Sequence, residues 1–229
     1  MEKMHKSFYP MTMFIVAMTS IVTILQFIYP EILNIFRRDP VGLAAGEWWR
    51  VITPLLVHAD GWWQYVFNIA SIIIVGSEVE RLYGGVKLLI LYLAGGLIGE
   101  IVGYASWDPY GAGASVGLCG LIGGLFVVML SRERKIHIAP AMLSLYIIVG
   151  LVGIASEEIY VLIGLFIVAS IVMAIIIRQK LAKLSDILFG LGGLLGGVTL
   201  LVFRDIHGAA ILGGSVTAII LILVYRNRN

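Results

Sequence analysis

Two residues of this sequence have the chemistry of a nucleophile and its general base. Ser115 lies near the head of an apolar, glycine-rich run, and His207 lies at the start of another apolar run. A serine hydroxyl becomes a nucleophile when an imidazole within hydrogen-bond reach accepts its proton. A serine in such a run is also explained by close helix packing alone. The elements that carry the two residues therefore decide between catalysis and packing.

The composition indicates a polytopic membrane protein. Of the 229 residues, 60% are hydrophobic and 13% are charged, whereas soluble domains have about a quarter of charged residues. A spanning helix needs about 20 apolar residues. We therefore expect one all-α membrane domain over residues 1–229, with about eight (six to eight) transmembrane helices. The expected spans are 11–29, 62–79, 86–106, 112–130, 139–155, 158–177, 184–203 and 206–225.

Charge and cysteine content exclude several classes of protein. The formal net charge of +2 is too small to indicate a nucleic-acid partner. The single cysteine, Cys119, excludes an intramolecular disulfide and a cysteine-rich zinc site, and its apolar surroundings are typical of a core residue. We expect no metal and no cofactor. The sequence shows neither a signal-peptide nor a transit-peptide pattern, so we expect a multi-pass protein of a bacterial plasma membrane.

Basic residues in the short loops predict the orientation of the spans. They fall at both ends of the chain and in alternate loops, so the positive-inside rule places both termini in the cytoplasm. Ser115 and His207 then both lie near the outer ends of their spans, at the same depth by independent arguments. The basic residues are Lys3, Lys6, Arg132, Arg134, Lys135, Arg178, Lys180, Lys183, Arg226 and Arg228.

The segment 30–61, between the first two spans, is too long for an ordinary turn. It contains Trp48 and Trp49, and Trp62 and Trp63 follow it directly. Tryptophan favours the interface between membrane and water. We therefore expect a loop that lies partly in the outer leaflet, since the segment is too apolar for a free linker.

Two amide side chains lie within the second span. Gln64 and Asn68 are four residues apart and share one helix face. Polar groups inside a span usually bond to a neighbouring helix. The functional alternative is a pair of amide donors that stabilise an oxyanion, together with the backbone N–H of Ser115.

Small residues on three spans would let helices approach closely. Gly113, Gly117, Gly120 and Gly124 recur at intervals of three or four residues around Ser115, and the span 184–203 is also rich in glycine. His207, Ala210 and Gly214 lie on one helical stripe, at intervals of three and four. We interpret Asp205 as a helix N-cap rather than a catalytic acid, because residues i and i+2 do not share a face.

Taken together, these features resemble the rhomboid family of intramembrane serine proteases, over about residues 46–214. Residues 46–50 (GEWWR) are similar to the family's outer-loop WR motif. The segment from His58 to Asn68 is similar to the family's histidine-rich motif at the start of a span, which ends in Phe-Asn. Residues 113–115 (GAS) are similar to the GxS motif of the nucleophile, and His207 is followed by small residues three and seven positions later.

The resemblance implies a Ser115–His207 dyad without a third acid. Such an enzyme cleaves membrane-protein substrates within or beside a transmembrane helix, in the lipid bilayer. The resemblance also implies that Asn68 is an oxyanion donor and that Arg50 organises the outer loop. It implies neither a metal nor a nucleotide.

The sequence departs from the family pattern at several positions. Val116 follows the serine where the family usually has glycine, and Gln64 stands where it usually has histidine. Ala210 replaces the commoner glycine, and the segment from His58 to Asn68 is one residue longer than usual. Residues 139–177 add two spans, which we interpret as an inserted transmembrane hairpin that preserves the parity of the chain.

The leading hypothesis is a serine endopeptidase that uses the Ser115–His207 dyad. The alternative is an inactive rhomboid-like protein that binds transmembrane helices without cleaving them, and Val116 and Gln64 motivate it. A transporter is disfavoured because charged residues cluster at the ends of the spans. The sequence has neither the His-Glu-x-x-His pattern of a zinc protease nor paired aspartates within spans.

Overall fold

The computed structural model describes residues 8–131, 135–179 and 182–226, and the regular elements within these ranges are helices. The longer helices are α1 (Pro10–Ile28), α4 (Trp62–Ser71), α5 (Ser77–Tyr83), α6 (Gly85–Val102), α7 (Ser115–Ser131), α8 (Ile138–Ala155), α9 (Ile159–Gln179), α10 (Ala182–Val202) and α11 (Ile206–Arg226). Two π-helical turns, η3 (Ile72–Gly76) and η4 (Gly103–Trp107), continue α4 and α6.

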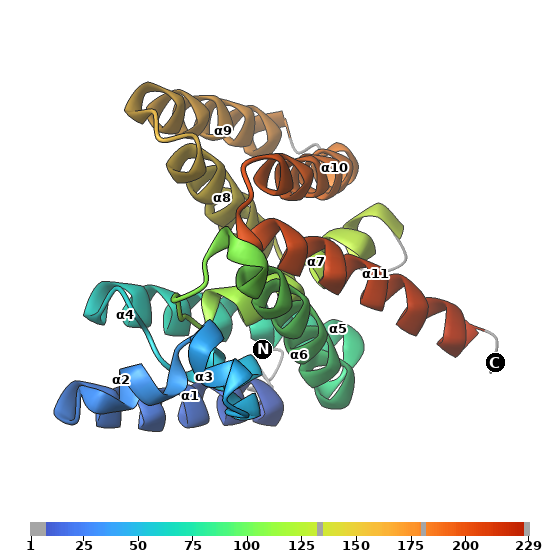
Figure 1. Cartoon of the computed structure of the whole chain (residues 1–229). Helices are drawn as coiled ribbons and strands as arrows, with labels where there is room; N and C mark the ends of the chain where they lie inside the picture. Colours follow the sequence, from blue (N-terminus) through green and yellow to red (C-terminus); the bar gives the residue numbers. More distant parts are fainter. Residues whose placement is uncertain (1–7, 132–134, 180–181, 227–229) are drawn as a thin grey trace.

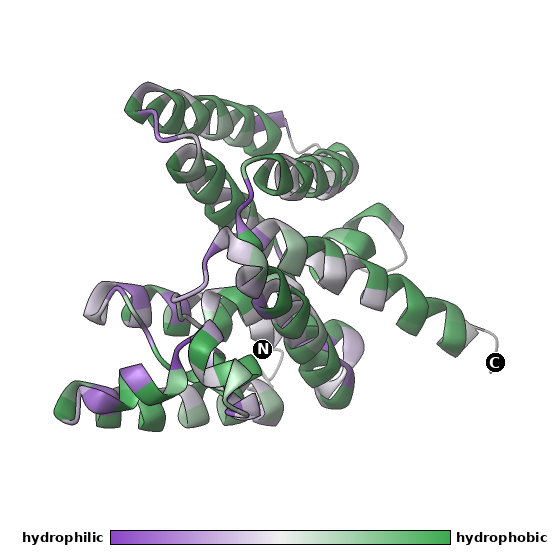
Figure 2. Ribbon diagram, viewed as in Figure 1, coloured by the Kyte–Doolittle hydropathy of each residue, from purple (hydrophilic) through white to green (hydrophobic). Residues whose placement is uncertain are grey.

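The helices confirm the expected polytopic bundle. Within the described residues, six helices are long and apolar enough to cross a membrane. Helix α7 is apolar but shorter, with 17 residues. The second expected span is one helical run over residues 62–83, built from α4, η3 and α5. Polar residues concentrate in the connections between helices, as the purple stretches of Figure 2 show.

Helices α6, α7 and α11 form the centre of the bundle, with α1–α4 on one side and α8–α10 on the other (Figure 1). Glycines let these three backbones touch. A Cβ added to Gly120 would meet the Leu91 carbonyl oxygen and Gly95 Cα, and one added to Gly214 would meet the backbone of Gly120. Cys119, beside this contact, is fully buried. The glycine spacing of the sequence thus corresponds to a three-helix contact.

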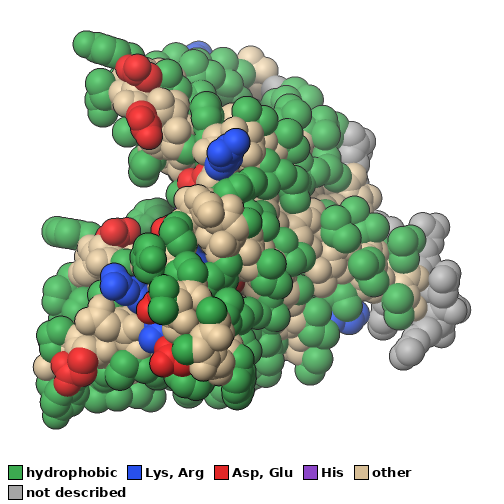
Figure 3. Space-filling model, viewed as in Figure 1, with side chains coloured by type: hydrophobic (Ala, Val, Ile, Leu, Met, Phe, Trp, Pro, Cys, Tyr) green, Lys and Arg blue, Asp and Glu red, His purple; other side chains and the backbone are tan. Residues whose placement is uncertain are grey.

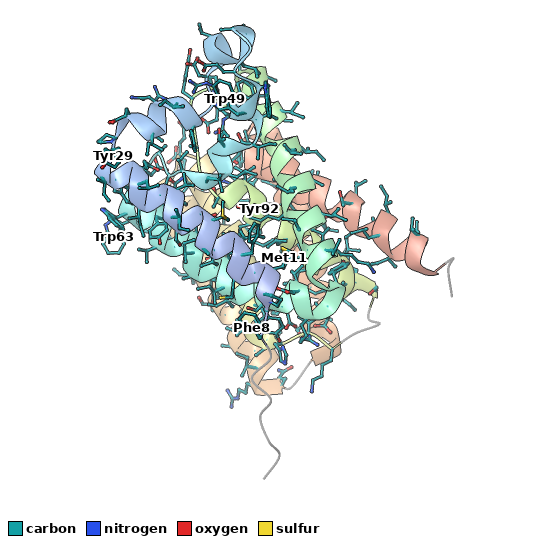
Figure 4. The ribbon with its side chains drawn as sticks, turned by 90° about the horizontal axis from the view of Figure 1, so that it is seen from below. Phe8, Met11, Tyr29, Trp49, Trp63 and Tyr92 are labelled. Carbon is teal, nitrogen blue, oxygen red and sulfur yellow. The ribbon has the colours of Figure 1, made fainter. Side chains whose placement is uncertain are left out.

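The outer segment is a chain of short helices: α2 (Glu31–Phe36), α3 (Pro40–Ala44), η1 (Trp48–Val51) and η2 (Thr53–Leu56). Arg50 is buried and ties them together, because its Nη1 donates to the carbonyl oxygens of Asn34 at 2.8 Å and Arg37 at 2.9 Å. Its Nε forms an ion pair with Glu47. Figure 4 shows Tyr29 and Trp49 toward one end of the bundle and Phe8 toward the other.

Helices α8 and α9 form a hairpin that packs mainly through α8. Helix α8 contacts α10 and the middle of the second span at η3, whereas most side chains of α9 are exposed. The buried residues of α9 are Ala169, Met173 and Ile176. Exposed apolar side chains are the ordinary state of a helix that faces lipid.

Candidate active site

Ser115 and His207 meet at the contact between α7 and α11. Ser115 is the first residue of α7, and His207 is the second residue of α11. Ser115 Oγ lies 2.9 Å from His207 Nε2, which is hydrogen-bond distance. The close approach of α7 and α11 along their glycines therefore brings the candidate nucleophile and base together, although 92 residues separate them.

The loop that precedes Ser115 is held by the outer segment. Three backbone hydrogen bonds connect them: Gly113 N to Pro54 O at 3.0 Å, Arg38 N to Gly111 O at 3.2 Å, and Ala59 N to Ala112 O at 3.4 Å. A Cβ at Gly113 would meet Gln64 Nε2 at 2.7 Å and Ser115 Oγ at 3.2 Å, so a side chain there would displace the end of the Gln64 side chain. The position of the serine is thus fixed from outside α7 as well as from within it.

A cavity of about 170 Å³ borders the serine–histidine pair. It lies between the outer segment, the start of α4 and the starts of α7 and α11. Figure 3 shows a hollow between the α8–α9 hairpin and the part of the molecule that carries α1–α4, with charged side chains on both sides of it. The cavity is lined by Arg38, Ala59, Asp60, Gln64, Asp108, Gly111, Ala112, Gly113, Ser115, Val116, Ile206 and His207.

The candidate oxyanion donors are arranged around Ser115. Its own N–H belongs to the first turn of α7, where backbone N–H groups have no acceptor within the helix. Gln64 Nε2 lines the cavity and donates to Ala112 O at 3.1 Å, which leaves its second hydrogen available. Asn68 is 2% exposed, and its Nδ2 has no hydrogen-bond partner among the described residues, but Asn68 does not line the cavity.

Val116 fits because the facing helix has no side chain at the point of contact. A Cβ added to Gly99 of α6 would meet Val116 Cγ1, so the valine fills the space that Gly99 leaves. Val116 is 2% exposed and also contributes to the cavity wall. Ala210, one turn after His207, is fully buried, and its methyl group lies near Gly99. The valine is thus accommodated between α6 and α7 beside the serine.

Asp205 has a larger part in the site than its sequence position indicates. Its Oδ1 accepts the backbone N–H of His207 at 2.8 Å, as expected for an N-cap. The same oxygen also lies 2.7 Å from His207 Nδ1. The argument that residues i and i+2 do not share a face was wrong here, because an N-cap residue lies outside the helix and its side chain folds back over the first turn.

Three further charged residues surround the site, and sequence reasoning did not identify them. Arg38 is 1% exposed, and its Nη1 forms a 2.6 Å ion pair with Glu100 Oε2 of α6, a residue that is fully buried. Arg38 Nη2 pairs with Asp108, and its Nε donates to Asp108 O at 2.6 Å. Charges were expected to cluster at the ends of the spans, whereas Glu100 lies inside the helical run formed by α6 and η4. A lone glutamate in an apolar run was the available signal.

A second cavity, of about 270 Å³, lies on the other side of His207. It is bounded by the end of η4, the connection from α10 to α11, and the outer end of the α8–α9 hairpin. The residues of the hairpin in its wall are Ile154, Ala155 and Glu157. Its other lining residues are Trp107, Asp108, Phe203, Arg204, Asp205, Ile206 and His207. The candidate base therefore borders two cavities.

Comparison with known proteins gives consistent relatives. The family model of the rhomboid domain matches residues 45–204. The chain is 41% identical over 93 residues to the rhomboid protease GluP of Bacillus subtilis, covering 40% of this chain and 18% of that protein. It is 36% identical over 135 residues to the putative rhomboid protease YdcA of Bacillus subtilis, covering 56% of this chain and 67% of that protein. It is 32% identical over 92 residues to the rhomboid protease GlpG of Haemophilus influenzae, covering 40% of this chain and 45% of that protein.

The matched range includes Ser115, the outer segment from Ala45 onward, and all of α4 to α10, and it ends before His207. It covers more than half of the chain, and several relatives in different organisms carry the same family name. This multi-pass membrane protein belongs to the rhomboid family.

Proposed function

We propose that this protein is an intramembrane serine endopeptidase that cleaves membrane-protein substrates within or beside a transmembrane helix. The observation that carries the proposal is the 2.9 Å distance between Ser115 Oγ and His207 Nε2, at the edge of a cavity among apolar helices. Family relatives named as proteases support the same reaction class. The α8–α9 hairpin fits an insertion between the helix that carries the serine and the last two helices.

The geometry supports acyl transfer. His207 Nε2 accepts the proton of Ser115 Oγ as that oxygen attacks the carbonyl carbon of a peptide bond. The negative charge that develops on the carbonyl oxygen is stabilised by N–H donors at the start of α7 and from Gln64, which lines the cavity. The imidazolium then gives its proton to the leaving amine, and water hydrolyses the acyl-enzyme with His207 again as the base.

Helix α7 adds an electrostatic contribution. Because Ser115 is its first residue, the developing oxyanion lies at the positive end of the helix dipole, where anions are stabilised. The proposed orientation places both termini in the cytoplasm and the site toward the outer leaflet. The substrate's scissile segment would then reach the site from the outer half of the bilayer.

The test is covalent labelling with a fluorophosphonate in detergent, combined with cleavage of a designed substrate that contains one transmembrane helix. We expect the wild type to be labelled and to release product, and Ser115→Ala and His207→Ala to do neither. Folding of both variants is checked by their thermal unfolding. A folded wild type that binds the substrate but is neither labelled nor active would instead favour the inactive helix-binding protein.

A further inference from the structure

The imidazole of His207 is bonded at both ring nitrogens. Ser115 Oγ lies 2.9 Å from Nε2, and Asp205 Oδ1 lies 2.7 Å from Nδ1. An ionised carboxylate can only accept a hydrogen bond, so Nδ1 must carry the hydrogen. A neutral imidazole then has its free lone pair on Nε2, facing the serine. This is the tautomer that a general base requires.

The backbone holds Asp205 in this position. Arg204 has a positive φ of 58°, and its turn directs the chain from α10 into α11. Asp205 N donates to Leu200 O at 2.9 Å, and Asp205 O accepts from Gly208 N at 3.1 Å. These two hydrogen bonds fix the backbone of Asp205 at the start of α11, and with it the position from which the carboxylate reaches His207. The carboxylate also accepts the His207 N–H, so one oxygen orients both the backbone and the ring of the histidine.

The surroundings keep this pair largely shielded and Asp205 charged. The Asp205 and His207 side chains are 23% and 18% exposed. Burial raises the pKa of the Asp205 carboxyl group, but the hydrogen bonds from His207 and the charge of His207 outweigh that effect. The pKa of Asp205 therefore lies below its ordinary value. Other charged groups near His207 are Glu100 of α6, Asp108, Arg38, Asp60, Arg204 and Glu157, of which Arg38 pairs with both Glu100 and Asp108.

We infer that Asp205 is a positioning residue of the proposed reaction, which makes the site a Ser115–His207–Asp205 triad rather than a dyad. The inference rests on the proposed function. When the serine proton moves to Nε2, the Nδ1–H bond to Asp205 remains and its carboxylate stabilises the imidazolium. The proton then leaves from Nε2 to the amine, so Asp205 itself neither gains nor loses one.

The test compares Asp205→Ser with the wild type. Serine is also a good N-cap, so this variant keeps the cap of α11 and removes the carboxylate. We expect the rate of fluorophosphonate labelling at pH 7.5 to fall by about 10²-fold or more, by analogy with other serine hydrolases.

Asp39→Ser is the matched control. Asp39 is the N-cap of α3, where its Oδ1 accepts from Val41 N at 3.0 Å, and it does not line either cavity. The same substitution there should leave the rate of labelling unchanged. Asp205→Asn, which keeps the size of the side chain and a cap, provides a second variant if Asp205→Ser does not fold.

A readout that needs no catalysis is the ¹⁵N spectrum of the imidazole, assigned with His207→Ala. In the wild type at neutral pH we expect the Nδ1–H tautomer, and the Nε2–H tautomer would overturn the inference. Labelling of Asp205→Ser at the wild-type rate would overturn it as well and leave the proposed function standing. Absence of labelling in the folded wild type would overturn the proposed function instead.

Discussion

Arg38 and Glu100 form an ion pair whose two members are both withdrawn from solvent. The guanidinium also holds Asp108, so it joins the outer segment to α6 and to the loop before Ser115. Removing one member of such a pair leaves an uncompensated charge, which typically costs about 3–5 kcal/mol. Removing one member of this pair should therefore lower the free energy of unfolding by more than removing a charge at the surface.

We expect Arg38→Met to lower the free energy of unfolding by about 3–5 kcal/mol, because Glu100 would remain buried without its partner. The double variant Arg38→Met/Glu100→Gln should recover part of this loss. Thermal or denaturant unfolding in detergent measures both. Lys135→Met is the control, since Lys135 is exposed and substitutions at the surface usually change stability by less than about 0.5 kcal/mol. Equal losses in the two single variants would contradict the argument.

His58 predicts a dependence of stability on pH. It is fully buried, its Nδ1 bonds to Thr23 Oγ1 at 2.9 Å, and burial lowers its pKa to about 4. Above about pH 6.5 both folded and unfolded states are neutral at this residue. Between about pH 6.5 and 4 the unfolded state alone binds a proton, so stability falls by about 3 kcal/mol as the pH is lowered.

We therefore expect His58→Gln to flatten the decrease in unfolding temperature between pH 6.5 and 4, whatever it costs at neutral pH. A wild-type unfolding temperature that does not change over this range would show that His58 does not remain neutral in the folded state.

The central contact of α6, α7 and α11 depends on the absence of side chains. We expect Gly120→Val to lower stability by about 1–3 kcal/mol or more, because its Cβ would meet backbone atoms of α6 that cannot move alone. Labelling of Ser115 should fall with it. Gly164→Val is the matched control, since a Cβ at Gly164 of α9 has no neighbour within 4 Å. Thermal unfolding and fluorophosphonate labelling of both variants test this pair.

The outer end of the α8–α9 hairpin forms part of the wall of the second cavity. If a substrate chain occupies that cavity, Ala155→Trp should slow cleavage of the polypeptide at least several-fold, while labelling by the small fluorophosphonate stays unchanged. Ala174→Trp, at an exposed position of α9, should affect neither. A parallel loss of cleavage and labelling in Ala155→Trp would indicate damage to His207 rather than loss of a binding surface.

The sequence predicts the helices more completely than it predicts the site. Runs of apolar residues are long and periodic, so the spans and the close packing around Gly120 could be recognised locally. The equal depth of Ser115 and His207 followed from counting spans. Asp205, by contrast, acts through the geometry of a helix start, and the pairing of Arg38 with Glu100 joins distant segments. Such contacts depend on the path of the chain, which residue spacing does not encode.

The orientation of the whole molecule is a further prediction. The distribution of Lys and Arg among the loops places the N-terminus and the C-terminus on the cytoplasmic side. Fusion of a reporter that is active only in the cytoplasm to either end should give a signal, and a reporter inserted in the connection between α8 and α9 should give none. Signals of opposite kind from the two termini would contradict an even number of spans.

Cys119 gives this protein a practical property. The chain has one cysteine, and the fold buries it completely beside the three-helix contact. A thiol in that position is inaccessible to reagents in water. The native chain can therefore serve as its own background for spin or fluorescent labels at introduced cysteines. Distances between such labels on α4, α8 and α10, measured with and without a membrane-protein substrate, would then report how these helices move when the substrate binds.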